Sequence, residues 1–372
     1  MTRYRDLGLV VGQLQPGALN AITDVEGVRV GVSTLIEGEG PLVRGRGPVR
    51  TGVTVIVPTE GIGRQVVFAG SHRLNGNGEL TGLEWVRESG VLSTPVAITN
   101  THSVGVVRDA LVAHDVATHE SHDSFWSLPV VGETYDGGLN DINGFHVRPE
   151  HLDAALASAS GGPVPEGNVG GGTGSICHEF KGGTGSASRV VGGWTVGALV
   201  QANHGRRERL TVDGVPVGRE IPTSEIPSAW DEEERIARAG AGSIIVVLAT
   251  DAPLLPHQLD RVAQRAGLGI ARAGGGGEHS SGDLFLAFST ADVESLNSYK
   301  LESEGNAPVE ISMLPDTEIT SLFWAASEAV EEAILNALVA AETLTGRDGI
   351  TGYALPHDRL VEIMTRYGRG PD

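Results

Sequence analysis

The sequence is poor in cysteine, in basic residues and in long apolar runs, and each shortage excludes a class of protein. Cys177 is the only cysteine among 372 residues, so the chain cannot hold an intrachain disulfide. Acidic residues outnumber basic ones by 47 to 27, giving a net charge of −20, whereas a nucleic-acid-binding protein would carry a basic face. No apolar run approaches the roughly 18 residues of a membrane-spanning helix. The first residues also lack the basic start and apolar core of a signal peptide, so we expect a cytoplasmic protein without nucleic-acid or membrane partners.

Glycine, in contrast, is abundant. The 53 glycines predict many strands and tight loops rather than a helical bundle, and the 40% of hydrophobic residues suffice for a core. Runs rich in Val and Ile, bounded by Gly, Pro and Asn, predict strands at residues 27–34, 52–58, 95–100, 192–203, 243–250 and 283–290. Because some of these runs are apolar at every position, we expect strands that are covered on both faces, as in a layered sandwich.

Helical patterns alternate with some of these strands and become frequent late in the chain. They lie at residues 104–114, 253–267, 318–346 and 357–368. For the second helix, Thr250 and Asp251 are candidate caps and Gly267 is a candidate stop. Together the patterns predict an α/β or α+β protein.

The connection from residue 204 to 242 is unusually long for a compact domain. Connections of this length are usually functional or disordered. A surface insertion with a short helix over residues 228–240 is the simplest interpretation.

Ser243 lies where this glycine-rich connection becomes a predicted buried strand, directly after Gly242. A serine hydroxyl is a weak nucleophile that needs a base, and a serine at a new N-terminus has one in its own α-amine, with a pKa of about 7.7–8.0. Glycine before it tolerates a strained backbone and leaves its carbonyl open to attack. The junction therefore predicts a self-cleavage site, although a serine that merely begins a strand gives the same pattern.

Asn203 ends the strand that precedes the long connection. If that strand and the one that begins at Ser243 are antiparallel neighbours, the end of the first lies beside the start of the second. The Asn203 amide would then lie near Ser243 and could donate to an oxyanion. An asparagine that only forms a turn before His204 is the alternative.

Six segments carry a resemblance to a known family. They resemble the DmpA-type aminopeptidases, the L-aminopeptidase/D-esterase family that includes the β-peptidyl aminopeptidases, and the likeness covers nearly the whole chain. The segments are GAGSIIVVLATDAPLLPHQL (240–259), PVVGETYDGGLNDINGFHV (129–147), NGNGELTGLEW (75–85), TNTHSVGVVRDA (99–110), GALVQANHG (197–205) and SSGDLFLAFST (280–290).

The resemblance implies a fold and an activity. The family is similar to N-terminal-nucleophile hydrolases, with an αββα four-layer sandwich. It implies one domain, 1–372, that cuts itself between Gly242 and Ser243 into an α chain (1–242) and a β chain (243–372), with Ser243 as nucleophile. It also implies a homo-oligomer of αβ units that needs no metal or cofactor. The substrates would be short peptides, amides or esters, among them those of D- or β-amino acids.

The resemblance also assigns roles to five further residues. Asn203 matches the oxyanion-hole asparagine, and Tyr135 matches a tyrosine at the active site. Ser281 matches a serine that contacts the nucleophile, and Asp283 stands where the family carries an acidic residue. Glu133 is expected to hold the free ammonium group of the substrate.

The remaining sequence patterns are weaker indications of function or depart from the family sequence. The loop Gly274–Gly277 and Ser280 depart from the usual family sequence, which leaves the pocket wall and the substrate preference open. The glycine tracts 170–175 and 182–186 lack the Gly-Lys-Ser/Thr of a phosphate-binding loop. The histidine-rich stretch 114–123 lacks the spacing of a zinc protease, and Cys177 is expected to be an unreactive thiol.

Two rival functions stay open from the sequence alone. An acyltransferase of similar fold, as in ornithine acetyltransferase, would pass the acyl group to an amine, but such proteins resemble a threonine-nucleophile pattern and Ser243 disfavours it. A non-catalytic relative is the second rival. Retention of Ser243 together with Asn203, Tyr135, Ser281 and Asp283 argues against it.

Overall fold

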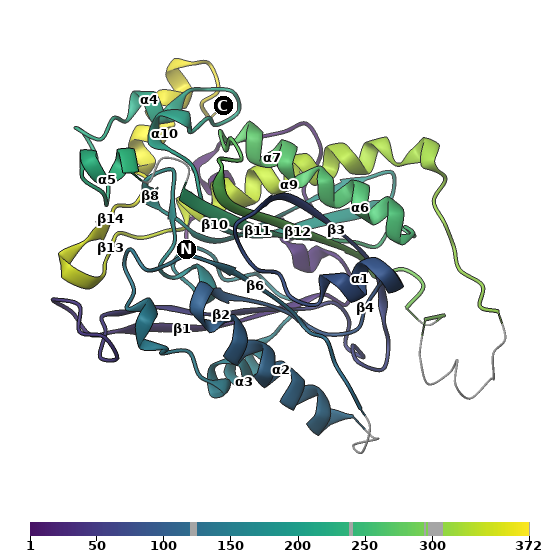
Figure 1. The fold of residues 1–372 in the computed structure, drawn as a ribbon. Coiled ribbons are helices and arrows are strands. Elements are labelled where there is room, and N and C mark those ends of the chain that lie inside the picture. The colour runs from purple at the N-terminus through teal and green to yellow at the C-terminus, as the bar shows by residue number, and fades with distance from the viewer. Residues whose placement is uncertain (120–124, 238–240, 294, 297–307, 372) are drawn as a thin grey trace.

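The molecule is built from four layers. A computed structural model describes residues 1–119, 125–237, 241–293, 295–296 and 308–371. Two sheets lie face to face, and helices cover the outer face of each (Figure 1). This arrangement confirms the predicted α/β class and the αββα sandwich.

The smaller sheet has four strands in the order β1-β2-β5-β6, with β5 and β6 parallel and the other neighbours antiparallel. Helices α2 and α3 pack against its outer face through an apolar cluster that includes Val53, Val55, Leu111 and Leu152. The elements of this half are β1 (Arg29–Glu37), β2 (Val49–Val57), β5 (Val96–Asn100), β6 (Val130–Thr134), α2 (Val104–Thr118) and α3 (Pro149–Ser158).

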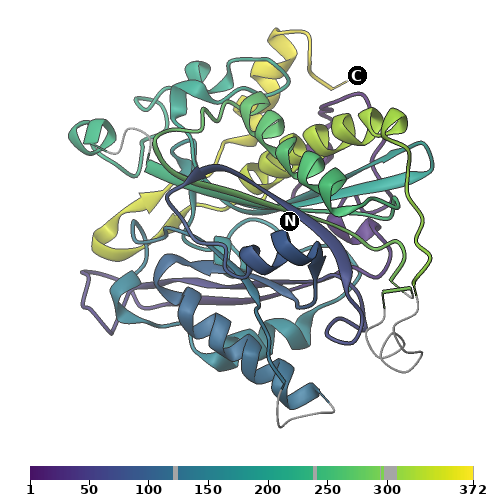
Figure 2. The ribbon, with the colours of Figure 1, turned by 45° about the vertical axis from the view of Figure 1, so that its right-hand side comes forward.

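The larger sheet has six strands in the order β4-β3-β12-β11-β10-β9. Three helices cover its outer face, and the turned view in Figure 2 shows the same layering. The elements of this half are β4 (Val91–Leu92), β3 (Val67–Gly76), β12 (Ser280–Ser289), β11 (Ala241–Thr250), β10 (Trp194–Asn203), β9 (Gly183–Val191), α6 (Pro256–Gln264), α7 (Ala266–Arg272) and α9 (Thr320–Val339).

Shorter elements surround the two sheets. None of the helices in the described ranges is long and apolar enough to span a membrane. The short elements are α1 (Leu83–Ser89), α4 (Val217–Glu220), α5 (Glu232–Ala237), α10 (His357–Arg366) and the hairpins β7 (Ile176–Cys177) with β8 (Phe180–Lys181) and β13 (Leu344–Thr345) with β14 (Thr351–Gly352). Helix α5 is the short helix predicted in the long connection, whose residues 238–240 lie outside the described residues.

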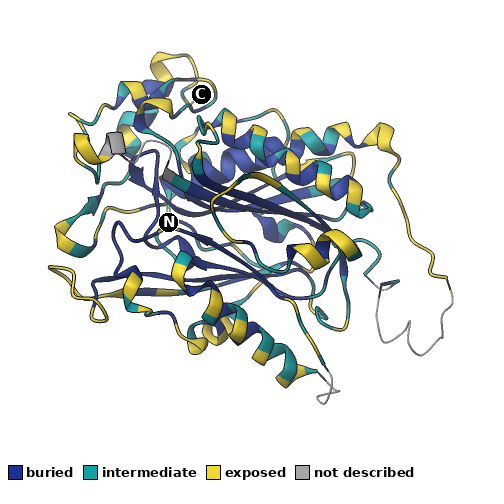
Figure 3. Cartoon of the chain, in the orientation of Figure 1, coloured by how far each residue is buried: buried dark blue, intermediate teal, exposed yellow. Residues whose placement is uncertain are grey.

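Strand β11 contains an unbroken run of apolar residues because it is covered on both of its faces. Successive side chains of a strand point to opposite faces. Ile244, Val246 and Leu248 pack in the layer between the large sheet and its helices, whereas Ile245 and Val247 pack between the two sheets. Both faces are therefore buried, as predicted, and Figure 3 shows β11 and its neighbours β10 and β12 as buried along most of their length.

The helical region after β11 differs from the single helix that the sequence predicted at residues 253–267. It is two helices, α6 and α7, and Gly267 lies inside the second rather than ending the first. Asp251, expected as a cap, instead accepts a hydrogen bond from the backbone of Thr195 at 2.7 Å. Glycine is needed within α7 because a Cβ atom at Gly269 would come within 2.6 Å of a backbone oxygen of α9.

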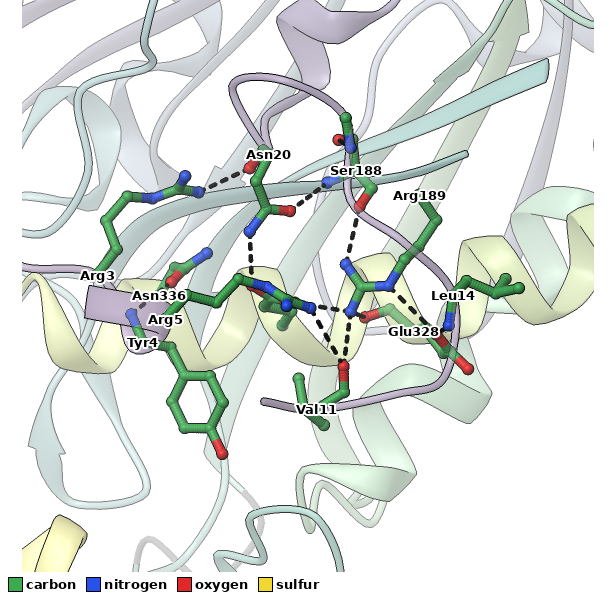
Figure 4. A network of polar contacts seen from close by, with 12 residues as sticks. Arg3, Tyr4, Arg5, Val11, Leu14, Asn20, Ser188, Arg189, Glu328 and Asn336 are labelled. Atoms are coloured by element: carbon green, nitrogen blue, oxygen red, sulfur yellow. Dashed lines mark hydrogen bonds and ion pairs between the residues drawn. The ribbon is translucent and has the colours of Figure 1, made fainter. Parts of the chain in front are cut away.

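Buried charges connect the N-terminal segment and β9 to α9. Arg189 donates to Glu332 at 2.7 Å and to Glu328 at 3.2 Å, and Arg5 donates to Glu332 at 2.7 Å. Asn20 also donates to Glu332. Figure 4 shows Arg5, Asn20 and Arg189 beside α9. We call Arg5, Asn20, Arg189, Glu328 and Glu332 the Arg189 network.

Candidate active site

A cavity of about 800 Å³ is lined by residues from both sheets. Six of the residues singled out from the sequence line it together: Glu133, Tyr135, Asn203, Gly242, Ser243 and Ser281. The seventh, Asp283, lies on β12 and is buried beside Ser281. The structure thus gathers all seven around one cavity.

Ser243 lies on β11 between two neighbouring strands. Asn203 of β10 is its antiparallel partner, which confirms the predicted pairing, and Gly282 of β12 is its parallel partner. The Ser243 hydroxyl donates to the carbonyl of Gly242 at 2.7 Å and accepts from the backbone N–H of Gly282 at 3.2 Å. The hydroxyl is therefore held beside the peptide group that precedes it.

Gly242 is needed for close approach of the chains. A Cβ atom at this position would lie 2.9 Å from the backbone oxygen of Asn203 and 2.9 Å from Cα of His204. Real Cβ atoms essentially never come so close to a backbone, so a side chain here would push β11 away from β10. The residue before Ser243 must be glycine for the two strand ends to meet.

The Asn203 amide is held at both ends. Its Oδ1 accepts from the backbone N–H of Ile176 at 2.8 Å, and its Nδ2 donates to the backbone carbonyl of Tyr135 at 2.8 Å. An amide NH₂ has two hydrogens, so one remains for a group in the cavity. Tyr135, whose carbonyl is held in this way, is 43% exposed and lines the same cavity.

Glu133 comes from the other sheet and is buried at the end of β6. Its carboxylate accepts from the backbone N–H of Glu79 at 3.1 Å and from the hydroxyl of Thr101. Burial raises the pKa of Glu133, and the bonds from Thr101 and Glu79 offset this only in part. Ionised Glu133 would therefore gain from a cationic partner in the cavity.

Ser281 and Asp283 form a chain of hydrogen bonds along β12. The Ser281 hydroxyl donates to Asp283, whose other oxygen accepts from the Asn75 amide at 3.2 Å. Burial raises the pKa of Asp283, while the bonds from Ser281 and Asn75 favour its ionised form. Ser281 is level with Gly242 in the register of β11 and β12. Asp283 is therefore placed to orient Ser281 beside the junction.

The charge of the cavity wall favours a cationic guest. Its acidic residues are Glu79, Glu133, Glu179 and Glu278, and its guanidinium is that of Arg206. A cavity lined mainly by one sign of charge raises the local concentration of the opposite sign. A free ammonium group suits this wall better than a carboxylate does.

The loop Gly274–Gly277, whose sequence departs from that of the family, lies mostly behind the residues that line the cavity. A Cβ atom at Gly274 would come within 1.9 Å of the backbone oxygen of Arg209, and one at Gly275 within 2.4 Å of the Ile270 side chain. The residues that follow, including Glu278 and Ser280, line the cavity. The loop thus sets the position of the wall rather than forming its surface.

Sequence reasoning missed the residues that orient the predicted ones. Asn75, Glu79 and Thr101 fix Asp283 and Glu133 by the bonds given above. They lie within the segments 75–85 and 99–110, whose resemblance to the family was the available signal.

Comparisons with known proteins agree with this geometry. The model of the family described as "Peptidase family S58" matches residues 20–352. The chain belongs to this peptidase family. It is 50% identical to "Beta-peptidyl aminopeptidase BapA" of Sphingosinicella microcystinivorans, over 99% of this chain and 93% of that protein.

Two solved structures give the same result. A β-aminopeptidase of a Burkholderia species is 52% identical, with a TM-score of 0.88 and 99% of each chain covered. The L-aminopeptidase D-Ala-esterase/amidase of Ochrobactrum anthropi, described as a prototype of the serine aminopeptidases with a variant of the Ntn-hydrolase fold, is 46% identical, with a TM-score of 0.88 and 99% of each chain covered. The protein is thus a hydrolase of the aminopeptidase type, which confirms the family and the activity predicted from the sequence, and the acyltransferase alternative is not favoured.

Proposed function

We propose that the chain cuts itself between Gly242 and Ser243, and that the new N-terminal Ser243 then hydrolyses N-terminal residues from short peptides, amides or esters. The observation that carries this proposal is the position of the Ser243 hydroxyl, 2.7 Å from the carbonyl oxygen of Gly242 and in the wall of the cavity. Self-cleavage begins when this oxygen attacks the Gly242 carbonyl carbon. The C–N bond breaks as the nitrogen takes a proton, and water hydrolyses the resulting ester to leave a carboxylate on Gly242 and a free amine on Ser243.

The mature reaction uses the same atoms on a substrate. Ser243 Oγ attacks the acyl carbon of the substrate and its proton passes to the Ser243 amine, which hands it to the departing group. The remaining N–H of the Asn203 side chain stabilises the oxyanion, and Tyr135 borders the same space. Water then releases the acyl group and regenerates Ser243. Ser281, oriented by Asp283, steadies the Ser243 end of β11.

Glu133 selects substrates with a free amine. A buried carboxylate that accepts from Thr101 and Glu79 has lone pairs left for an ammonium group, and the acidic wall favours the same charge. Because the relatives named above are β-aminopeptidases and an L-aminopeptidase with D-Ala-esterase/amidase activity, we include β-amino acid and D-amino acid substrates in the proposed class. No metal or cofactor takes part in these steps.

The expected homo-oligomer of αβ units and the cytoplasmic location remain part of the proposal. Large apolar side chains that are exposed on the single chain support the first: Trp126 is 62% exposed and Trp324 is 58% exposed. Aromatic residues are enriched at protein–protein interfaces relative to the rest of the surface. Light scattering of the purified protein tests this, and the mass of a single αβ unit would contradict it.

Intact mass and N-terminal sequencing test self-cleavage. From 38.7 kDa in all, the two chains should weigh roughly 25 and roughly 13.5 kDa, since residue mass is nearly uniform along a chain of ordinary composition. Ser243→Ala should stay whole and inactive because no hydroxyl remains to attack Gly242. Ser321→Ala, which removes a hydroxyl bonded to Glu318 at the start of α9, should be cleaved normally. Cleavage of the Ser243→Ala chain at the same bond would refute the mechanism.

A further inference from the structure

At and behind the cavity wall lies a second group of reactive side chains. Cys177 ends β7, His178 follows it in the tight turn to β8, and His204 follows Asn203 at the end of β10. All three side chains are buried. We call them the Cys-His-His cluster, and the aminopeptidase steps proposed above do not use them.

The three residues offer converging donor atoms. One ligand atom from each residue lies within 4.8 Å of the other two, and Cys177 Sγ is 4.0 Å from Nδ1 of His204. The hydrogen bonds fix which atom His178 can offer. Its Nδ1 lies 3.0 Å from the carbonyl of Arg206, so Nδ1 carries the hydrogen and Nε2 holds the lone pair.

Two atoms of the cluster have no hydrogen-bond partner. The Nε2 atoms of His178 and of His204 are buried and unpartnered in the part of the chain that the structure describes. Leaving a buried polar atom unsatisfied costs about 1–3 kcal/mol, so such atoms need an explanation. A bound ion would satisfy the His178 lone pair and remove part of this cost.

The backbone at the cluster is also held in an unfavourable conformation. His178 and Glu179 have φ values of 49° and 60°, in the left-handed region that non-glycine residues seldom adopt. Such residues persist where the surrounding structure imposes them, often at functional sites. Here the turn directs the His178 ring toward His204, and the two ring centroids are 5.2 Å apart.

We propose that Cys177, His178 and His204 form a binding site for a thiophilic divalent cation of the Zn²⁺ type, separate from the catalytic residues. Zn²⁺ favours thiolate and imidazole ligands at about 2.3 and 2.0–2.1 Å, so the donor atoms must close in by roughly 1 Å to bind it. Binding transfers the thiol proton of Cys177 to the solvent. Three protein ligands leave the fourth tetrahedral position to a water molecule.

The site is coupled to the cavity by position. His204 lines the cavity, follows Asn203 in the chain, and accepts a hydrogen bond at its carbonyl from the backbone N–H of His178 at 2.7 Å. A divalent cation here adds positive charge behind a wall that selects an ammonium group. The bound ion therefore inhibits aminopeptidase activity.

Metal titration of the purified protein tests the site. After treatment with a chelator, Cd²⁺ should bind one ion per chain and give the ultraviolet charge-transfer band of a thiolate–Cd²⁺ bond. Loss of groups that merely support ligands weakens metal sites about 10–100-fold, so Cys177→Ser should weaken binding by at least this factor and abolish the band. His178→Asn, a residue that tolerates the left-handed backbone, should also weaken binding. His257→Asn, at the start of α6, is the matched control and should bind as the unaltered protein does.

Activity in the presence of Zn²⁺ separates this site from the proposed mechanism. We expect Zn²⁺ to lower kcat/KM of the unaltered protein and to leave the Cys177→Ser variant much less affected, with both proteins fully cleaved and equally resistant to heat. No thiolate band, or a band that survives Cys177→Ser, would overturn the site. An ion that binds as expected without changing kcat/KM would overturn its inhibitory role. None of these outcomes depends on whether Ser243 is the nucleophile.

Discussion

The Arg189 network and the wall of the cavity are both buried and polar, but they are satisfied to different degrees. In the network, the Arg189 side chain contacts the carboxylates of Glu328 and Glu332, and those carboxylates also accept from Arg5 and Asn20. At and behind the cavity wall, the side chains of Ser175, His178 and His204 each keep a buried polar atom that has no partner among the described residues. Within the described residues, the buried carboxylates and guanidinium of the network are paired, whereas the region at the cavity keeps unpartnered polar atoms.

The difference indicates different tasks. A buried ion is tolerated when opposite charges and hydrogen bonds compensate it, and the network meets this condition. Burial alone would raise the pKa of Glu332, but Arg189, Arg5 and Asn20 more than offset burial and lower it. In the cavity, burial prevails and raises the pKa of Glu133. The network holds the N-terminal segment and β9 to α9, whereas the cavity keeps groups available for a guest.

The largest effect on stability should come from breaking the network. Arg189→Met leaves Glu328 and Glu332 buried without their main partner, and removing one member of a buried pair costs about 3–5 kcal/mol. Urea unfolding measures this best in the uncleaved Ser243→Ala chain, where a single molecule unfolds. Arg87→Met, which breaks an exposed pair with Glu84, should cost about 1 kcal/mol or less. Equal unfolding midpoints for the two variants would show that the network does not stabilise the fold.

The next largest effect should come from the oxyanion donor in the cavity. Asn203→Asp keeps an acceptor for the backbone N–H of Ile176 but removes the amide hydrogens and adds a negative charge. Loss of one oxyanion donor lowers kcat by about 10²–10³, and this variant should lose at least that much. The rate must be measured on the cleaved fraction, because the same change can slow self-cleavage. A cleaved variant with normal kcat would exclude Asn203 from the oxyanion site.

A smaller effect should follow from removing the charge that selects the substrate. Hydrogen bonds to charged groups are worth about 1.5–3 kcal/mol, so Glu133→Gln should raise KM for free-amine substrates by roughly 10–100-fold. Acetylated substrates should be inert with the unaltered enzyme. Glu84→Gln, which changes an exposed carboxylate on α1, is the control and should leave KM unchanged. Equal turnover of acetylated and free-amine substrates would remove Glu133 from this role.

Of these two regions, the sequence predicted only the cavity, partly from strand pairing and partly from the resemblance to a family. Ser243 and Asn203 could be placed together because each stands at the end of a strand, and antiparallel pairing brings such ends together. Glu133 and Tyr135 belong to or follow a strand of the other sheet, and no local pattern shows how two sheets face each other. Only the resemblance to a family placed them at the site.

The Arg189 network could not be read from the sequence at all. Arg189 is 139 residues from Glu328 and 143 from Glu332. Local periodicity indicates that α9 has an apolar face but not that buried acids on it meet an arginine from β9. The need for glycine at position 269 of α7 escaped prediction for a similar reason, since it is explained by the distant helix α9 that packs on it.

The smallest and most diagnostic effect should be on the pH profile of kcat/KM. If the base is the Ser243 α-amine, it must be neutral, and activity should rise through its pKa of about 7.7–8.0. Glu133 must be ionised to hold the ammonium; burial raises its pKa, so its protonation also lowers activity as the pH falls. The substrate amine must stay protonated to bind Glu133, and it titrates in the same range as the Ser243 amine. Activity should therefore fall again at higher pH.

These ionisations together give a narrow bell on the alkaline side of neutral. A histidine base would place the rising limb at lower pH, because burial lowers the pKa of the candidate His204, beside Asn203, from its usual 6.5 to about 3. His204→Gln should leave the rising limb in place if the amine is the base, because Nδ1 of His204 faces Cys177 rather than Ser243. If His204→Gln abolishes turnover of fully cleaved enzyme, the base is His204. Glu133→Gln should make the acid limb shallower, because one of the two ionisations that shape it is then lost.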